Sequence, residues 1–397
     1  MTETEDYSSS EKEAIEKLRA IIPKDVNKDM YEDTHQIHSI FKAQDFDLNE
    51  AEIMLTQILN WRKKLQIDKI SDFKPPEVIE NYFKKNRIGY SKEGAPVHYL
   101  PLGKFDSKGI YMSAKAIDVE KIYSKFLEED LKELRNLKKM PRGSYPGAIL
   151  IFDMDQLSFA TATDKKGLEY VIRCLKVCQD CYPGVLSAIY IINISSYFMI
   201  PLSIAKSFLS NSFISLAQMF GGDGWREELL KVIDADQLPA FLGGTKTDPD
   251  GNPLCKTLVC QGGKIDEKYY IHKSKNSLVS APDVKKIVLA RASFSEIELE
   301  VEEDGFLIEW EFETKTRDIG FGLFFKEIVD GEEKITELVP LLRINTEDYS
   351  ETGVYKCEKA GTYVMLFDNS YSWIRSKEIY YRTKVVNPKQ MKTEMQN

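Results

Sequence analysis

Two apolar runs in the middle of the chain constrain its fold most. The segments AILIF at 148–152 and AIYIINI at 188–194 are rich in β-branched residues and almost free of polar ones. Strands that are covered on both faces have this composition. Between them, GLEYVIRCLKVCQDCYP at 167–183 carries apolar residues at helical spacing until Pro183. The pattern predicts a strand, helix, strand unit within a partly parallel sheet, which is typical of an α/β domain.

The segment before this unit has a helical pattern. In DFDLNEAEIMLTQILNWRKKLQID at 45–68, apolar residues recur at the spacing of one helix face. Asp47 and Glu50 fit a capping box at its start. Pro75 and Pro76 then interrupt the pattern, so residues 1–75 are predicted to form a helical lead-in.

Beyond Pro253 the pattern changes to alternation of apolar and polar residues, which predicts strands with one buried face. The clearest examples are ASFSEIELEVEE at 292–303, GFLIEWEFE at 305–313, GFGLFFKEI at 320–328 and GTYVMLFD at 361–368. A chain of 397 residues also exceeds the roughly 250–300 at which a single core stops growing. We therefore expect a multidomain protein, α/β plus all-β. Its parts are a lead-in at 1–75, an α/β domain at 76–247, a connector at 248–275, a β domain at 276–386 and a tail at 387–397.

Charge and apolar content limit the partners and the location. The net charge is −9, with 54 basic and 63 acidic residues, so we expect no nucleic acid partner and only local contact with a membrane. The start MTETEDYSSSEKEA lacks the basic and apolar parts of a secretory signal. No apolar run reaches the roughly 18–20 residues that cross a bilayer. Six cysteines without framework spacing favour a reducing compartment, so the chain is predicted to be cytoplasmic.

The common catalytic signatures are missing from the sequence. It has no GxSxG elbow, no GxxxxGK[ST] loop, no GxGxxG after a strand and no HExxH pair. GGTKT at 243–247 has the wrong spacing for a phosphate loop and is interpreted as a turn. The four histidines lack the spacing of a helical metal pair. We expect no enzyme activity, no catalytic residue, no cofactor and no metal.

Two small clusters of reactive residues have structural and functional interpretations. Cys174, Cys178 and Cys181 share one helix face and would suit a metal or an oxidant, but core or pocket lining is favoured because reduced cysteine behaves as a small apolar residue. Asp153 and Asp155 end a strand and resemble paired catalytic carboxylates. Without a partnered nucleophile, capping and turn roles are favoured.

The segment SSYFMIPLSIAKSFLS at 195–210 is unusually apolar. Its apolar side chains would cover nearly all of a helix surface, although packing needs only one face. Two interpretations stay open. The segment is either a buried core helix or a movable lid, with one side closing a lipid cavity and the other meeting a membrane.

Several motifs, in order, resemble a known lipid-binding family. They are GYSKEGAPVHYLPLGKFDSKG at 89–109, IFDMDQLSF at 151–159, CYPGVLSAIYIINIS at 181–195, KSFL at 206–209 and DADQLPAFLGGTKTDPDGNP at 234–253. This set resembles the CRAL-TRIO lipid-binding domain, and FDLNEAEIMLTQILNWRK resembles its helical lead-in. DIGFGLFF and AGTYVMLFDNSYSWIRSKEIYY resemble the GOLD domain, a β-sandwich. Together they look like the branch that contains supernatant protein factor and tocopherol-associated protein.

The resemblance implies a closed lipid pocket, walled by the sheet and gated by the segment 196–210, whose ligand is moved or presented without chemical change. By position in the motifs, the expected lipid-binding residues are Leu157, Phe159, Tyr197, Phe198, Leu202, Ala205 and Phe208. The expected gate residues are Ile204, Lys206 and Leu209. A transient membrane surface and protein partners of the GOLD domain are the other expected contacts.

The motifs also bear on the cargo. Where relatives that hold phosphatidylinositol carry Tyr-Pro-Glu, this chain has Tyr182, Pro183 and Gly184. Where relatives show two arginines, it has Lys42-Ala43-Gln44. The resemblance therefore favours a weakly polar cargo, such as a tocopherol, sterol precursor or other isoprenoid, over phosphoinositide. A twenty-carbon apolar ligand at ~0.8 kcal/mol per methylene needs roughly 16 kcal/mol of shielding from water.

Two functions remain open at this point. The first is the transfer between membranes, or the presentation, of a hydrophobic lipid, which is a tocopherol, an isoprenoid or sterol precursor, or a phospholipid. The second is a lipid-responsive adaptor that acts in membrane traffic or signalling through the GOLD domain. Two basic clusters are either membrane contacts or solvated faces, and the second interpretation is favoured. They are Lys84, Lys85 and Arg87, and Arg135, Lys138, Lys139 and Arg142.

Overall fold

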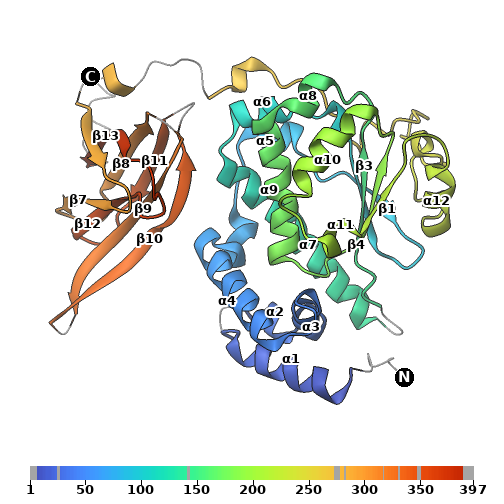
Figure 1. Cartoon of the computed structure of the whole chain (residues 1–397), viewed down its shortest axis with the longest axis horizontal. Helices are drawn as coiled ribbons and strands as arrows, with labels where there is room; N and C mark the ends of the chain where they lie inside the picture. Colours follow the sequence, from blue (N-terminus) through green and yellow to red (C-terminus); the bar gives the residue numbers. More distant parts are fainter. Residues whose placement is uncertain are drawn as a thin grey trace. The chain divides into compact units, whose positions relative to one another are not determined.

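The chain forms two compact units, Met1–Tyr270 and Ile271–Asn397, in a computed structural model (Figure 1). The structure describes residues 7–24, 27–140, 144–271, 278–280, 283–315, 317–329, 331–346 and 350–387. Arg142 and nearly all of the predicted tail at 387–397 lie outside the described residues. The finer boundaries of the five predicted segments stay predictions.

The first unit begins with a group of helices, as the sequence predicts. These are α1 (Ser9–Ile21), α2 (Lys28–Glu32), α3 (Thr34–Ala43), α4 (Leu48–Leu65), the 3-10 turn η1 (Ile67–Asp72) and α5 (Glu77–Tyr82). At the start of α4 the Asp47 carboxylate accepts hydrogen bonds from the backbone N–H groups of Asn49 and Glu50. This cap fixes the predicted start of the helix. Leu18, Ile40 and Leu55 are fully buried among α1, α3 and α4.

Arg62 anchors the lead-in to the rest of the unit. Its buried guanidinium lies 2.7 Å from Asp68 and 2.5 Å from Glu128 of α7 (Ala116–Lys139). The hydroxyl of Tyr182 donates to the same Glu128 oxygen at 2.8 Å. Burial would lower the pKa of Arg62, but the Glu128 and Asp68 carboxylates outweigh it and raise that pKa. The ion pairs therefore stabilise the junction as long as all partners are present.

The central sheet has five strands in the order β1 (Arg87–Tyr90), β2 (Pro96–Leu100), β3 (Ala148–Asp153), β4 (Leu186–Ile192) and β5 (Ala217–Met219). Strands β2 to β5 are parallel, and β1 pairs with β2 antiparallel. Helix α9 (Lys165–Cys181) joins β3 to β4, which confirms the predicted strand, helix, strand unit.

Alternate residues of these strands divide the core into two layers. One face carries Leu150, Phe152, Ile189 and Ile191, and it packs toward α6 (Ser107–Ser113), α7 and α9. The other face carries Val97, Tyr99, Ile149, Ile151 and Tyr190, and it packs against α12 (Trp225–Val232) and the segment that follows. Figure 1 shows α12 on the opposite side of the sheet from α9. Buried side chains thus cover both faces, as the composition of the strands predicted.

Short elements complete the unit. They are η2 (Leu102–Lys104), α8 (Phe159–Thr163), η3 (Ser196–Phe198), α10 (Met199–Ala205), α11 (Asn211–Ile214), η4 (Ala240–Leu242) and η5 (Glu267–Tyr269). GGTKT forms a turn, in which Gly243 has a left-handed φ of 94°. Asp153 accepts hydrogen bonds from the backbone of Asp155 and the side chains of Asn193 and Tyr99. Its predicted turn role is confirmed.

The second unit is a sandwich of two antiparallel four-stranded sheets, after the turn η6 (Leu278–Ser280). One sheet has the order β10 (Glu332–Asn345), β9 (Asp318–Val329), β12 (Gly361–Asp368), β7 (Phe294–Val301). The other has the order β11 (Glu351–Lys356), β8 (Leu307–Thr314), β13 (Lys377–Val386), β6 (Lys285–Leu289). Phe312, Phe321 and Phe367 meet between the sheets, with ring centroids 4.6 to 5.4 Å apart. All four predicted strands are present.

Candidate functional site

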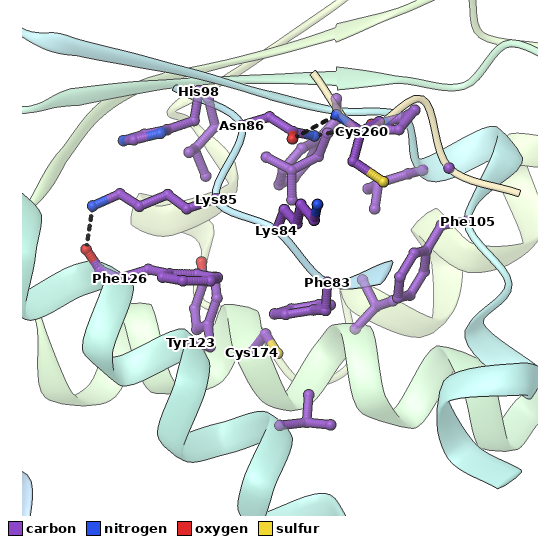
Figure 2. Close-up of a pocket in the computed structure, with 18 of the residues that line it drawn as sticks. Phe83, Lys84, Lys85, Asn86, His98, Phe105, Tyr123, Phe126, Cys174 and Cys260 are labelled. Carbon is purple, nitrogen blue, oxygen red and sulfur yellow. Dashed lines mark hydrogen bonds between the residues drawn. The ribbon is translucent and has the colours of Figure 1, made fainter. Parts of the chain in front are cut away.

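An apolar cavity lies between the central sheet and helices α6, α7 and α9. It holds about 1040 Å³ of space that no protein atom occupies, its mouth included. Leu100, Leu150 and Phe152 form part of its floor, and Tyr123 and Cys174 face them from α7 and α9. Figure 2 shows His98 and Lys85 at one end of this space and Phe105 toward the other.

A second apolar cavity of about 980 Å³ adjoins the first on the side of α10. Its wall includes Ile189 and Ile191 of the sheet and Leu202 and Ala205 of α10. Both cavities are lined by Leu102, Phe105, Phe152, Val171 and Leu175. These shared residues show that the two cavities adjoin in one largely apolar space between the sheet and the helices.

One end of the first cavity is polar. Nε2 of His98 lies 3.0 Å from Oδ1 of Asp130, and Nζ of Lys85 lies 2.8 Å from the same oxygen. Burial alone would raise the pKa of Asp130, but the hydrogen bond with His98 and the charge of Lys85 outweigh it and lower that pKa. Asp130 is therefore ionised at neutral pH, and its charge is balanced by Lys85.

Only one of the two ring nitrogens of His98 takes part in this pairing. An ionised carboxylate only accepts, so Nε2 donates to Asp130, and Nδ1 is the ring nitrogen left for another partner. Among the described residues, Nδ1 of the buried His98 has no hydrogen-bond partner. Leaving a buried polar atom unpaired costs about 1–3 kcal/mol, so a hydroxyl group of a ligand would be bound well here.

The three cysteines of α9 are buried, and Cys174 lines the first cavity. Burial raises the pKa of Cys174 to about 12, and it raises the pKa values of Cys178 and Cys181 further. The thiols are therefore protonated and behave as apolar side chains. Their predicted role as core or pocket lining is confirmed.

The segment 196–210 is not one continuous helix. It consists of η3, the short α10 and a turn, followed by α11, which Ser210 caps through Phe213 N–H. Pro201 lies in the first turn of α10, where its missing N–H is tolerated. The inner side chains face the second cavity, whereas Met199 is 61% exposed on the outside.

The residues predicted to bind lipid fall into two groups. Leu157, Phe198, Leu202 and Ala205 line the second cavity together with the gate residue Leu209.

The other predicted residues lie on the outer side. Phe208 and Ile204 line a surface groove between α9 and Trp61 of α4. Phe159 and Tyr197 are exposed, with ring centroids 5.9 Å apart, and Lys206 is exposed as well. The roles of all ten residues stay predictions.

Sequence reasoning missed the polar end of the cavity. His98 stands inside the apolar run PVHYL of β2, and a polar residue in a buried strand is a signal that could have been noticed. Its partner Asp130 lies 32 residues further on, in a helix whose register the sequence alone does not fix.

Position 184 has no room for a carboxylate. Gly184 has a left-handed φ of 81°, and a Cβ atom added there would lie 2.3 Å from Oγ of Ser39. A glutamate at this position would meet both backbone strain and a steric clash.

Known proteins match both units. Residues 80–244 match the CRAL/TRIO domain, and residues 326–385 match the Golgi-dynamics membrane-trafficking domain, GOLD_2. Protein ctg-1 of Caenorhabditis elegans is 25% identical over 95% of this chain and 97% of its own length. Protein real-time of Aedes aegypti is 25% identical over 71% of this chain, which spans only 44% of that protein. The crystal structure of Sfh5 covers 68% of this chain and 97% of its own, with 18% identity and a TM-score of 0.44.

The chain therefore contains a CRAL-TRIO domain and a GOLD domain, as its sequence resemblance indicated. The CRAL-TRIO family binds and transfers small lipophilic ligands. Within the described part of the chain, no helix is long and apolar enough to cross a membrane. The same residues contain no group of three His, Cys, Asp or Glu side chains that would hold a metal ion.

Proposed function

We propose that the first unit carries one hydrophobic lipid molecule in its two adjoining cavities and transfers it between membranes without chemical change. The observation that carries this proposal is the apolar space that borders both the sheet and the segment 196–210. Protein interiors are otherwise close-packed, so an apolar space between the sheet and the helices suits an apolar ligand.

The polar end of the space supports a cargo with one weakly polar group. A hydroxyl would form a hydrogen bond with Nδ1 of His98, while the apolar remainder extends along Phe152 and Leu175 toward α10. Lys85 already pairs with the carboxylates of Asp130 and Glu129, so it has no unpaired positive charge to offer an anionic headgroup. A tocopherol, a sterol precursor or another isoprenoid alcohol fits this chemistry better than phosphatidylinositol does.

The segment 196–210 acts as the gate in this proposal. Leu202 and Ala205 close the second cavity, whereas Met199, Tyr197 and Phe208 are exposed on the outer side. Exposed aromatic and apolar side chains on a short segment suit the interface of a bilayer. Contact with a membrane would hold the gate open, and the lipid would leave without crossing water.

A matched pair of variants on α10 tests the proposal. Ala205→Trp fills the second cavity, and Ser203→Trp adds the same side chain at an exposed position of the helix. We expect Ala205→Trp to reduce the transfer of a fluorescent sterol between vesicles at least tenfold, and Ser203→Trp to retain it. Equal transfer by both variants, with both folded by circular dichroism, would contradict the proposal.

A further inference from the structure

The loop between β12 and β13, residues 369–376, presents two adjacent hydrophobic side chains to solvent. Trp373 is 80% exposed and Ile374 is 86% exposed, more than any other large hydrophobic side chain that the structure describes. Single exposed apolar residues are common, but a neighbouring Trp and Ile at the tip of a loop form a concentrated apolar point. Neither residue lines the two cavities of the first unit.

Hydrogen bonds within the loop and with the neighbouring residues Ala290 and Ala292 fix its conformation. Nδ2 of the fully buried Asn369 donates to the carbonyl groups of Ala290 and Arg375, at 2.8 and 3.0 Å. Oγ of Ser372 donates to the same Arg375 carbonyl at 3.0 Å, and the Ala292 N–H donates to the Ser372 carbonyl. The tip is thus preorganised, which lowers the entropy cost of binding.

Three exposed arginines surround this tip. Arg375 lies in the loop itself, and Arg291 adjoins Ala292, which bonds to the loop. Arg317 belongs to the β8–β9 turn, where the Lys315 N–H donates to the carbonyl of Glu378, near the start of β13. None of the three forms an ion pair with another residue in the described ranges.

Two acidic groups at the same end are already paired. Asp318 lies 2.5 Å from Arg343 and 3.3 Å from Lys377, and Glu378 lies 3.0 Å from Lys286. Asp368, at the end of β12, accepts a hydrogen bond from the Ser370 N–H and forms no ion pair in the described ranges, so three arginines and this one carboxylate lie around the tip.

The opposite end of the sandwich is acidic. The turn after β7 carries Glu302, Glu303 and Asp304, and β7 separates it from the arginine-rich end. Strand β12 runs antiparallel to β7. Gly361 therefore pairs with Val301 beside the acidic turn, and Asp368 pairs with Phe294 at the end near the tip. The eight residues of β7 span roughly 25 Å, beyond the Debye length of about 8 Å at physiological salt. The unit therefore has a cationic apolar end and an anionic end.

From this arrangement we infer that the tip formed by Trp373 and Ile374 inserts into the headgroup region of an anionic bilayer. Trp prefers the membrane interface, and Arg291, Arg317 and Arg375 would contact lipid phosphates. A protein partner is less suited, since a stable interface needs about 800 Å² on each side and the two side chains of the tip present a much smaller area. This contact is separate from the gate and does not depend on which lipid the first unit carries.

Vesicle binding by the full chain tests this inference. We expect the chain to sediment with vesicles of phosphatidylcholine and phosphatidylserine at low salt, and to do so several-fold less at 0.5 M salt. The variant W373S/I374S should lose at least tenfold in binding. Ile328→Ser is the matched control, since Ile328 is 79% exposed at the far end of β9, and it should bind as the parent chain does.

Tryptophan fluorescence gives a second readout on the same samples. Trp225 and Trp310 are buried and Trp61 is partly buried, so a blue shift on vesicle binding would report mainly on Trp373. Trp373→Phe should remove the shift and keep most of the binding. Parent-like vesicle binding by W373S/I374S, or an unchanged emission spectrum of the bound parent chain, would overturn the inference, and so would a chain that binds only a protein.

The same variant separates this inference from the proposed function. W373S/I374S should still co-purify with the lipid of the first unit, because it leaves both cavities intact. Normal vesicle binding by a chain that carries no lipid would contradict the transfer function alone. Normal lipid content together with parent-like vesicle binding by the variant would contradict only the inferred insertion of the tip into the membrane.

Discussion

Nε2 of His98 lies 3.0 Å from Oδ1 of Asp130, and both side chains are buried in the wall of an otherwise apolar cavity. The pair has a chemical consequence. It orients the imidazole so that Nδ1 is left for another partner, and it does so in the cavity that no residue of α10 lines. The cavity therefore distinguishes one end of a lipid from the other.

Replacing His98 should change which lipids are retained. His98→Leu removes the hydrogen-bonding partner of the hydroxyl, so we expect the affinity for an isoprenoid alcohol to fall about tenfold, the equivalent of roughly 1.4 kcal/mol. The affinity for the corresponding hydrocarbon should change little. Titration of both ligands by tryptophan quenching measures the difference. His98→Gln serves as the control, because its amide can both donate to Asp130 and accept from a hydroxyl, and it should retain part of the preference.

The lowered pKa of Asp130 makes a specific contribution to stability against acid. Because the folded-state pKa lies below the unfolded one, this stability is fully present above the ordinary value of 3.8 and is lost as the pH falls through the folded-state value. Urea unfolding of the parent chain and of Asp130→Asn between pH 7 and pH 3 measures it. The stability difference between them should shrink on acidification, and a constant difference would count against the ion pairs.

The buried cluster around Arg62 should be sensitive to loss of one partner. Arg62→Met leaves Glu128 and Asp68 without their cation, so we expect about 3–5 kcal/mol of destabilisation in urea. Arg87→Met, which breaks the more exposed pair with Glu133, should cost about 0–1 kcal/mol. Similar losses for the two variants would show that burial of the Arg62 cluster does not matter.

The outer side of the gate should affect transfer without affecting occupancy. Phe208 is 54% exposed, so Phe208→Asp should leave the fold and the bound lipid unchanged while it weakens contact with the membrane. We expect vesicle-to-vesicle transfer to fall at least tenfold. If this variant transfers lipid at the parent rate, the segment 196–210 does not meet the membrane through this side chain.

The sequence predicted those elements whose pattern reflects burial. AILIF and AIYIINI are covered on both faces in β3 and β4, and the alternating segments of the second unit became β7, β8, β9 and β12. By contrast, β10 is mostly exposed along its first half, so its apolar and polar residues do not alternate with a buried face. Nothing in its pattern marked it as a strand.

The site was predictable in part for a related reason. Leu202 and Ala205 line a cavity, and the apolar composition of the segment 196–210 was the signal that predicted it. Hydrophobicity alone does not tell the inner side from the outer side when both are apolar, so Phe159 and Tyr197 could not be distinguished from lining residues. The pairing of His98 with Asp130 depends on how β2 packs against α7, and this is a tertiary property that spacing does not contain.

The most direct measurement is the identity and amount of lipid that the purified chain carries, by mass spectrometry of its organic extract. We expect about one molecule per chain of a neutral lipid with a single hydroxyl group, and much less from Ala205→Trp. An extract dominated by phosphatidylinositol, or a chain that holds no lipid and takes up none from vesicles, would contradict the proposed cargo and the cavity that binds it.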